Sequence, residues 1–174
     1  MDTHTARSWD SYMDTLLAVM QEFQPKRVLE FGSGKSTGVM AMFPSVERII
    51  TNEHDIEYFS RFNKTAYDNL DMRLIQNEDE YATSFPRMSK YDLVFVDGAN
   101  RPRCLREVRK HVSDTGVVML HDAGREQYED AIREYAYAVF TDGGHTVCLT
   151  DSEATAKRLE SVLYKLTNTI GVKS

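Results

Sequence analysis

The stretch RVLEFGSGKST, residues Arg27–Thr37, decides the fold of this chain. A short apolar run ends in an acidic residue, a Gly-Ser-Gly turn follows, and Lys-Ser-Thr opens a predicted helix. A strand, a glycine turn and a helix in this order bring a nucleotide-like ligand against backbone N–H groups and the positive end of the helix. We therefore expect a ligand to bind at the turn that follows the first strand.

Two classes of ligand use such a turn. The tail GSGKST copies the end of a phosphate-binding P-loop, whose pattern is G-x-x-x-x-G-K-[ST]. Counting back from Gly34, the first glycine of that pattern should stand at position 29, which is Leu29. Glu30 would also lie close to the phosphates and repel them, whereas a carboxylate suits a cationic or hydroxyl-rich ligand. We predict a site for S-adenosylmethionine, with a P-loop-like nucleotide-binding enzyme as the main alternative.

The length of 174 residues predicts one domain, 1–174, with an N-terminal helix over about 8–23, a core over 27–150 and a C-terminal helix over about 152–167. The hydrophobic content of 41% is ordinary for a soluble globular protein. Neither a signal peptide nor an apolar run that could span a bilayer is present, and the two cysteines, Cys104 and Cys148, have no metal-binding spacing. We expect a reduced, cytoplasmic protein without a membrane partner.

The net charge of −6 gives no overall field that would attract nucleic acid. Basic residues do cluster in one segment, and we interpret them as a solvated helix face rather than a binding patch. They are Arg101, Arg103, Arg106, Arg109 and Lys110. We predict no nucleic-acid partner.

Helical and strand patterns alternate along the chain, which predicts a parallel sheet covered on both faces. The first five strands are predicted over 27–31, 48–51, 72–76, 91–96 and 116–120. Helices are predicted over about 8–23, 36–43, 55–70, 102–111, 126–137 and 152–166. Residues 138–141 and 145–150, joined by Asp-Gly-Gly, predict an antiparallel hairpin.

Five parallel strands and a closing hairpin resemble the seven-stranded sheet of class I S-adenosylmethionine-dependent methyltransferases, from about Arg27 to Thr150. Three motifs carry the resemblance: LEFGSGKST at the first strand, NEHD after the second and YDLVFVDG in the fourth. The VDG followed by Arg101, and the later HDAGREQY, resemble a group of small bacterial and phage-like members. The resemblance implies an α/β, three-layer Rossmann-like fold, mostly parallel with a C-terminal antiparallel hairpin. It also implies S-adenosylmethionine as the cofactor.

Acidic residues gather where strands are predicted to end, which is the edge where open α/β sheets bind ligands. Glu53 follows the glycine turn by about twenty residues, the spacing of an acid that grips ribose hydroxyls, although a surface acid capping the next helix is the alternative. In the P-loop interpretation Lys35 binds the phosphates. In the S-adenosylmethionine interpretation it contacts the carboxylate of the methionine moiety or points to solvent. By the resemblance, Glu78 or Asp79 accepts a hydrogen bond from the adenine amino group. The predicted cofactor-binding set is Glu30, Phe31, Gly32, Ser33, Gly34, Ser36, Thr37, Glu53, His54, Glu78, Asp79 and Asp97.

Three residues are predicted to carry catalysis. Asp97 ends the central strand, beside the expected methyl group, where three roles are open to it: orienting the substrate nucleophile, acting as a base or ligating a divalent ion. His121 and Asp122 end the neighbouring strand. Histidine takes a proton near neutral pH, so His121 is the predicted base, with a structural histidine as the alternative. The same three residues would also form a Mg²⁺ or Mn²⁺ site. Metal-dependent members of the family carry lysine where this chain has Asn100, and Asp-Asp or Asp-Asn where it has His121-Asp122, which argues against a metal.

Arg101 and Arg125 are predicted to bind a carboxylate or phosphate of the acceptor, with plain surface arginines as the alternative. One helix precedes the first strand and no long insertion supplies a lid, so the acceptor is small, bound at a homo-oligomer interface or supplied by a partner. The sequence thus predicts methyl transfer to an oxygen or nitrogen of a small polar molecule. A protein of this fold that binds S-adenosylmethionine without methylating remains a second alternative.

Overall fold

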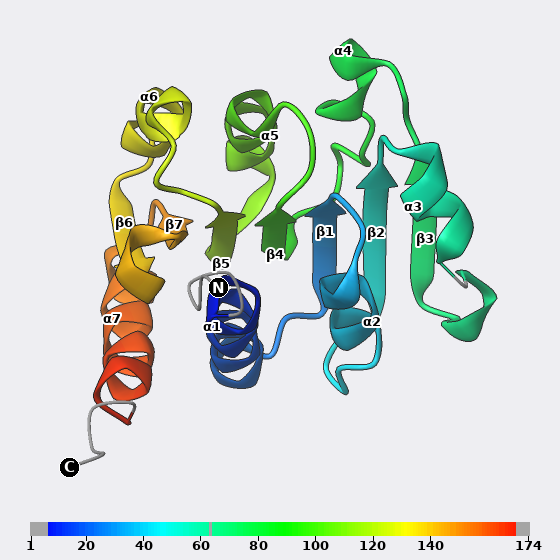
Figure 1. Cartoon of the computed structure of the whole chain (residues 1–174). Coiled ribbons are helices and arrows are strands. Elements are labelled where there is room, and N and C mark those ends of the chain that lie inside the picture. The colour runs from blue at the N-terminus through cyan, green and yellow to red at the C-terminus, as the bar shows by residue number, and fades with distance from the viewer. Residues whose placement is uncertain (1–6, 63, 170–174) are drawn as a thin grey trace, which may run out of the picture.

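The computed structural model describes residues 7–62 and 64–169, and the side chains of residues 12–62, 65–141 and 143–164 (Figure 1). The described residues form one seven-stranded sheet in the order β3-β2-β1-β4-β5-β7-β6. Its strands are β1 (Arg27–Phe31), β2 (Arg48–Glu53), β3 (Leu70–Leu74), β4 (Tyr91–Val96), β5 (Val112–His121), β6 (Tyr137–Thr141) and β7 (Thr146–Thr150). Strands β1 to β5 are parallel, whereas β7 runs antiparallel to both β5 and β6. The strand order reverses between β1 and β4, which makes the end of this pair the expected ligand crevice.

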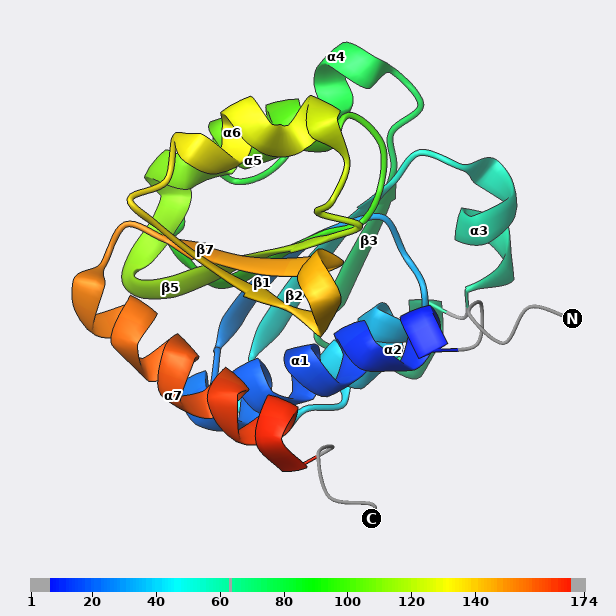
Figure 2. The same ribbon diagram turned by 60° about the vertical axis from the view of Figure 1, so that its left-hand side comes forward.

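Helices cover both faces of the sheet and give three layers (Figure 2). One face carries α1 (Arg7–Phe23), α2 (Lys35–Ala41) and α7 (Glu153–Thr169), and the other carries α4 (Glu78–Tyr81), α5 (Arg101–Val108) and α6 (Glu129–Arg133). Helix α3 (Ile56–Arg61) contacts β2 and β3 at the edge of the sheet. The predicted α/β fold, mostly parallel with a C-terminal antiparallel hairpin, is confirmed.

The central strands explain the two cores. Leu93 and Phe95 of β4 pack with α1 and α7, while Val94 and Val96 pack with α5 and α6 on the opposite face. Such continuous apolar runs are typical of strands that are buried on both faces. Both cysteines lie buried and unpaired in these cores, and burial raises the pKa of each thiol. They are packing residues here. Trp9 and Leu166 belong to the helices that flank the cores, but their side chains lie outside the described set.

Two predicted helices were too long. The helix predicted over 55–70 is capped by Asp55 at its start but ends at Arg61, and β3 starts at Leu70 rather than Met72. Helix α3 ends where the backbone of Phe62 becomes extended, and pairing with β2 begins only at Leu70. The helix predicted over 126–137 is a 3₁₀ turn followed by α6, which ends at Arg133 because Tyr137 pairs with Thr150 in the hairpin.

One short helix, α4, was missed. Asn77 caps it by accepting hydrogen bonds from the backbone N–H groups of Asp79 and Glu80. The residues that were expected at a strand end therefore begin a short helix, whose Tyr81 packs into the core on one face of the sheet. Within the described residues, no helix has the length and apolar character needed to cross a membrane.

Candidate active site

The glycine turn after β1 is fixed by close packing. Gly32 has φ +94, in the left-handed region that favours glycine, and a Cβ there would lie 2.7 Å from the backbone of Gly98. The ends of β1 and β4 can approach this closely only because neither residue has a side chain. Gly34 differs, since its backbone is extended and a Cβ would meet open space.

Hydrogen bonds use every backbone N–H group of the turn. Gly32 N–H donates to Asn52 O at 2.8 Å, and Ser33 N–H donates to a Glu53 carboxylate oxygen at 2.7 Å. Gly34 N–H donates to Thr37 Oγ1 at 2.9 Å. The turn is therefore held by β2 and by the first turn of α2.

Glu30 lies beneath this turn with no exposure to solvent. Its carboxyl group accepts hydrogen bonds from the hydroxyls of Ser36, Thr37 and Thr51 at 2.6, 2.7 and 2.8 Å. Burial raises the pKa of Glu30 to about 7, although these hydroxyl bonds oppose the shift. Glu30, Phe31 and Thr37 were predicted to touch the cofactor, but the structure places them behind the turn, where they support it without lining a cavity.

A cavity of about 470 Å³ opens at the carboxyl ends of β1, β2, β4 and β5. Its volume is within the range of small-molecule sites. It brings together ten of the predicted site residues: Gly32, Ser33, Gly34, Ser36, Glu53, His54, Asp97, Arg101, His121 and Asp122. It also includes Lys35 and three residues that the sequence analysis did not select: Tyr12, Tyr58 and Gly98.

Glu53 is buried at one end of the cavity and carries four hydrogen bonds. One carboxylate oxygen accepts from Ser33 N–H and Ser33 Oγ, at 2.7 and 2.6 Å. The other accepts from the N–H groups of His54 and Asp55, at 2.7 and 2.8 Å. Asp55, not Glu53, caps α3. Glu53 is therefore a buried acid at the cavity, and not a surface acid that caps the next helix.

The residues predicted to recognise adenine lie elsewhere. Glu78 and Asp79 occupy the first turn of α4, outside the cavity. The Asp79 side chain is 89% exposed and forms an ion pair with Arg103 at 2.6 Å. The aromatic rings that border the Glu53 end of the cavity are instead those of His54 and Tyr58, both partly exposed.

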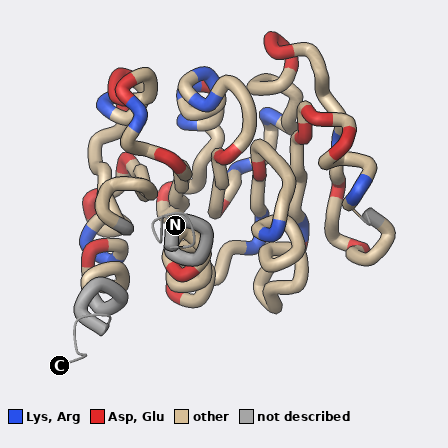
Figure 3. The backbone as a smooth tube through the Cα atoms, viewed as in Figure 1, with Lys and Arg blue, Asp and Glu red and all other residues tan. Residues whose placement is uncertain are grey.

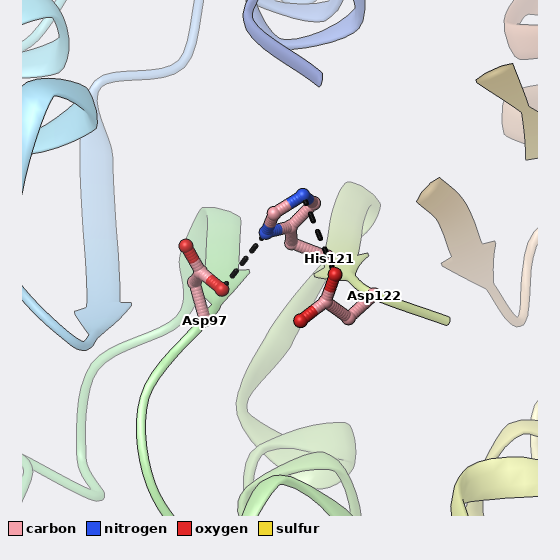
Figure 4. A group of neighbouring side chains, drawn as sticks. All are labelled: Asp97, His121 and Asp122. Carbon is pink, nitrogen blue, oxygen red and sulfur yellow. Dashed lines mark hydrogen bonds and ion pairs between the residues drawn. The ribbon is translucent and has the colours of Figure 1, made fainter. Parts of the chain in front are cut away.

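Asp97 and His121 meet at the other end of the cavity (Figure 4). Asp97 Oδ1 and His121 Nδ1 are 3.0 Å apart, and His121 Nε2 lies 3.8 Å from Asp122 Oδ1. A carboxylate only accepts, so Nδ1 carries the proton of this hydrogen bond, and in neutral histidine Nε2 then has the free lone pair. The pair can accept a proton at Nε2.

Arg101 ties the ends of β4 and β5 together and is only 11% exposed. Its guanidinium donates to the backbone carbonyls of Gly98, Asp97 and His121, at 3.0, 3.0 and 2.6 Å. It also lies 3.1 Å from Asp97 Oδ1 and 3.5 Å from Asp122 Oδ2. Because its nitrogens are engaged within the protein, Arg101 holds the site rather than presenting a free fork to a substrate anion. Arg125 donates to Asp122 at 2.6 Å and lies outside the cavity lining.

Asp97, His121 and Asp122 offer the kinds of side chain that bind a divalent metal ion. Ligand atoms of Asp97, His121 and Asp122 lie within 4.8 Å of one another. The Arg101 cation, however, already contacts both carboxylates, and His121 Nδ1 is bonded to Asp97. Among the described residues His121 Nε2 is not hydrogen-bonded, but a divalent ion there would lie beside the Arg101 guanidinium, whose positive charge repels it, so the residues present fit a Mg²⁺ or Mn²⁺ site poorly.

Tyr12 reaches the cavity from α1. Its ring lies 4.6 Å from the His121 ring and 5.8 Å from the Phe95 ring. Burial raises the pKa of Tyr12, and the charges of Asp97 and Glu30 raise it further, so the hydroxyl stays protonated. Tyr12 belongs to the helix predicted over about 8–23, and the sequence carried no signal of its place at the site.

The arginine-rich segment is paired with acids. Arg103, Arg106 and Arg109 form ion pairs with Asp79, Glu134 and Asp151. Acidic and basic residues are correspondingly interspersed along the chain (Figure 3). A second cavity, of about 410 Å³, lies near Lys90, Arg109 and Ser152, by the starts of β4 and β5, and none of the predicted site residues lines it.

No protein-family model and no curated protein matches the sequence. Solved structures do match. Human methyltransferase-like protein 13 in complex with S-adenosylhomocysteine has a TM-score of 0.64 at 14% identity, over 94% of this chain and 92% of that one. A methyltransferase-like protein from Silicibacter pomeroyi has a TM-score of 0.61 at 15% identity, over 86% and 93%. Spermidine synthase from Thermotoga maritima has a TM-score of 0.57 at 17% identity, over 85% and 62%. The chain thus has the Rossmann-like fold of class I S-adenosylmethionine-dependent methyltransferases.

Proposed function

We propose that this protein is an S-adenosylmethionine-dependent methyltransferase that acts on an oxygen or nitrogen atom of a small polar molecule. The observation that carries the proposal is a single cavity with the glycine turn and Glu53 at one end and the Asp97–His121 pair at the other. This cavity lies at the strand-order reversal between β1 and β4, where open α/β sheets bind their ligands.

The Glu53 end suits the cofactor. The Glu53 carboxylate can accept a hydrogen bond from a ribose hydroxyl that displaces the Ser33 hydroxyl, and the neighbouring rings of His54 and Tyr58 suit the faces of an adenine. Lys35, exposed at the cavity wall, suits the carboxylate of the methionine moiety. The complex of human methyltransferase-like protein 13 with S-adenosylhomocysteine supports the same ligand class for this fold.

The Asp97–His121 end suits methyl transfer. When bound, the sulfonium supplies an already activated methyl group, so the protein mainly aligns the acceptor and excludes water. His121 takes the proton of the acceptor at Nε2, while Asp97 fixes the tautomer and orientation of the ring through Nδ1. Arg101 keeps the ends of β4 and β5 in register for this pair.

The P-loop alternative is disfavoured by two features. All three backbone N–H groups of residues 32–34, the donors that a P-loop aims at phosphates, are bonded within the protein. The carboxylates of Glu53 and Asp97 border the same cavity and would repel a polyphosphate.

A protein of this fold that binds S-adenosylmethionine for other chemistry, or for none, is the second candidate. The likeness to spermidine synthase, whose name describes a different reaction, is the observation that favours it. It differs from the main proposal in predicting cofactor binding without methyl transfer to any acceptor.

The test is isothermal titration of the purified protein with S-adenosylmethionine and, in parallel, with ATP and Mg²⁺. We expect S-adenosylmethionine to bind and ATP not to bind. Glu53→Gln should weaken binding about tenfold or more, because a hydrogen bond to a charged group is worth about 1.5–3 kcal/mol. Glu57→Gln is the matched control, since that side chain is 72% exposed on α3 and paired with Arg61. Binding of ATP alone would overturn the proposal.

A further inference from the structure

Tyr12 sits against the proposed base. It is only 4% exposed, yet it borders the cavity beside Asp97 and His121. Its ring lies nearly parallel to that of Phe95, with 13° between their planes, and is tilted by 40° from the His121 imidazole. Helix α1 thus adds an aromatic wall beside the strand ends that carry Asp97 and His121.

His121 has two carboxylate neighbours that compete for it. Nδ1 is 3.0 Å from Asp97 Oδ1, whereas Nε2 is 3.8 Å from Asp122 Oδ1, beyond hydrogen-bond distance. A ring that moved about 1 Å toward Asp122 could donate from both nitrogens, as an imidazolium does. It would then have no lone pair with which to accept a proton.

Contacts on both sides oppose that movement. The Asp122 carboxylate is held by two arginines rather than by His121, because its Oδ2 lies 2.6 Å from Arg125 and 3.5 Å from Arg101. The Tyr12 ring covers a face of the imidazole and is itself packed on Phe95. The groups that face His121 are thus Asp97 after β4, Asp122 after β5, Arg101 of α5 and Tyr12 of α1.

We propose that Tyr12 is a positioning residue whose ring keeps the His121 imidazole on Asp97 and away from Asp122, so that Nε2 stays unprotonated and open to the cavity. The use of Nε2 as a base rests on the proposed function, whereas the positioning itself does not. Within the described part of the chain, the Tyr12 hydroxyl has no hydrogen-bond partner, so the aromatic ring carries the effect.

The test reads the tautomer of His121 from the nitrogen-15 shifts of its imidazole at about pH 8, where histidine is ordinarily neutral. The spectrum of His121→Asn identifies the signals. We expect wild type and Tyr12→Phe to carry the proton on Nδ1 alone. In Tyr12→Leu and Tyr12→Met, which lack a ring, we expect a proton on Nε2; the second variant serves where the first does not fold.

The outcomes separate the two proposals. The positioning role is overturned if a folded Leu or Met variant keeps the wild-type tautomer, or if wild type already has Nε2 protonated. The measurement needs neither cofactor nor acceptor. A protein that shows the expected tautomers but binds no S-adenosylmethionine would lose the proposed function and keep the role of Tyr12.

Discussion

Glu30 is a buried carboxyl whose hydrogen-bond partners are three hydroxyl groups. Burial raises the pKa of this group to about 7 from an ordinary value of 4.5. Between these two values the folded protein holds a proton that the unfolded chain has lost, so the free energy of unfolding falls as pH rises. The contribution of Glu30 to the free energy of unfolding is fully present below about pH 4.5 and is lost as the pH rises through about 7. This contribution amounts to about 3 kcal/mol.

Glu30→Gln should therefore remove most of this decline. The amide side chain of this variant cannot ionise, so relative to wild type the variant gains stability steadily from about pH 5 to pH 8. Urea denaturation across this range measures the difference. Glu47→Gln, an exposed residue paired with Lys26, is the control and should keep the wild-type slope. A Glu30→Gln slope equal to that of wild type would contradict the raised pKa.

Ser33 limits access to Glu53. The four hydrogen bonds that Glu53 accepts fill its lone pairs, two of them from Ser33 alone. A ribose hydroxyl must displace the Ser33 hydroxyl, so Ser33→Ala should bind S-adenosylmethionine roughly two- to tenfold more tightly, the worth of one net hydrogen bond. Titration calorimetry measures this, with Ser45→Ala, whose hydroxyl bonds to Pro25 O, as the control. Weaker binding by Ser33→Ala would mean that the hydroxyl contacts the ligand instead.

At the level of helices and strands, sequence patterns predicted the bounds that depend on local residues, but not those that depend on contacts between distant segments. Strand β4 matches its predicted bounds because LVFV is a continuous apolar run, and β1 matches because the Gly-Ser-Gly turn marks its end. The helix end at Arg133 was missed because Tyr137 pairs with Thr150, a contact that is not local, whereas the extended backbone of Phe62 after Arg61 had no signal in the sequence. Within the site, the cavity position of Glu53 followed from spacing. The engagement of Arg101 and the stacking of Tyr12 did not, because both depend on which elements the fold brings together.

Arg101 and Arg125, which the sequence grouped together, should separate in stability measurements. Removing Arg101 leaves Asp97 and Asp122 facing each other and frees three backbone carbonyls, which costs about 2–4 kcal/mol. Arg125 is 56% exposed and pairs only with Asp122, so Arg125→Gln should cost less than about 1 kcal/mol. Urea denaturation of Arg101→Gln and Arg125→Gln tests this. Equal losses would mean that the Arg101 contacts do not tie β4 to β5.

At the level of the whole molecule, the cavity spans the sheet from β2 to β5, so a bound ligand stabilises every element that the cavity joins. A ligand that binds only the folded state adds about 2.7 kcal/mol at one hundred times its dissociation constant. For a chain of this size that corresponds to an increase in Tm of about 5–10 °C.

The two ends of the cavity should then respond differently to substitution. S-adenosylhomocysteine should raise the Tm of wild type and of His121→Asn equally, because the cofactor is expected at the Glu53 end and His121 at the transfer end. At the same ligand concentration, the Tm of Glu53→Gln should rise much less than that of wild type. Differential scanning calorimetry compares the three proteins with and without the ligand. An increase that disappears in His121→Asn but persists in Glu53→Gln would reverse the assignment of the two ends, and with it the orientation in which the methyl donor is expected to lie.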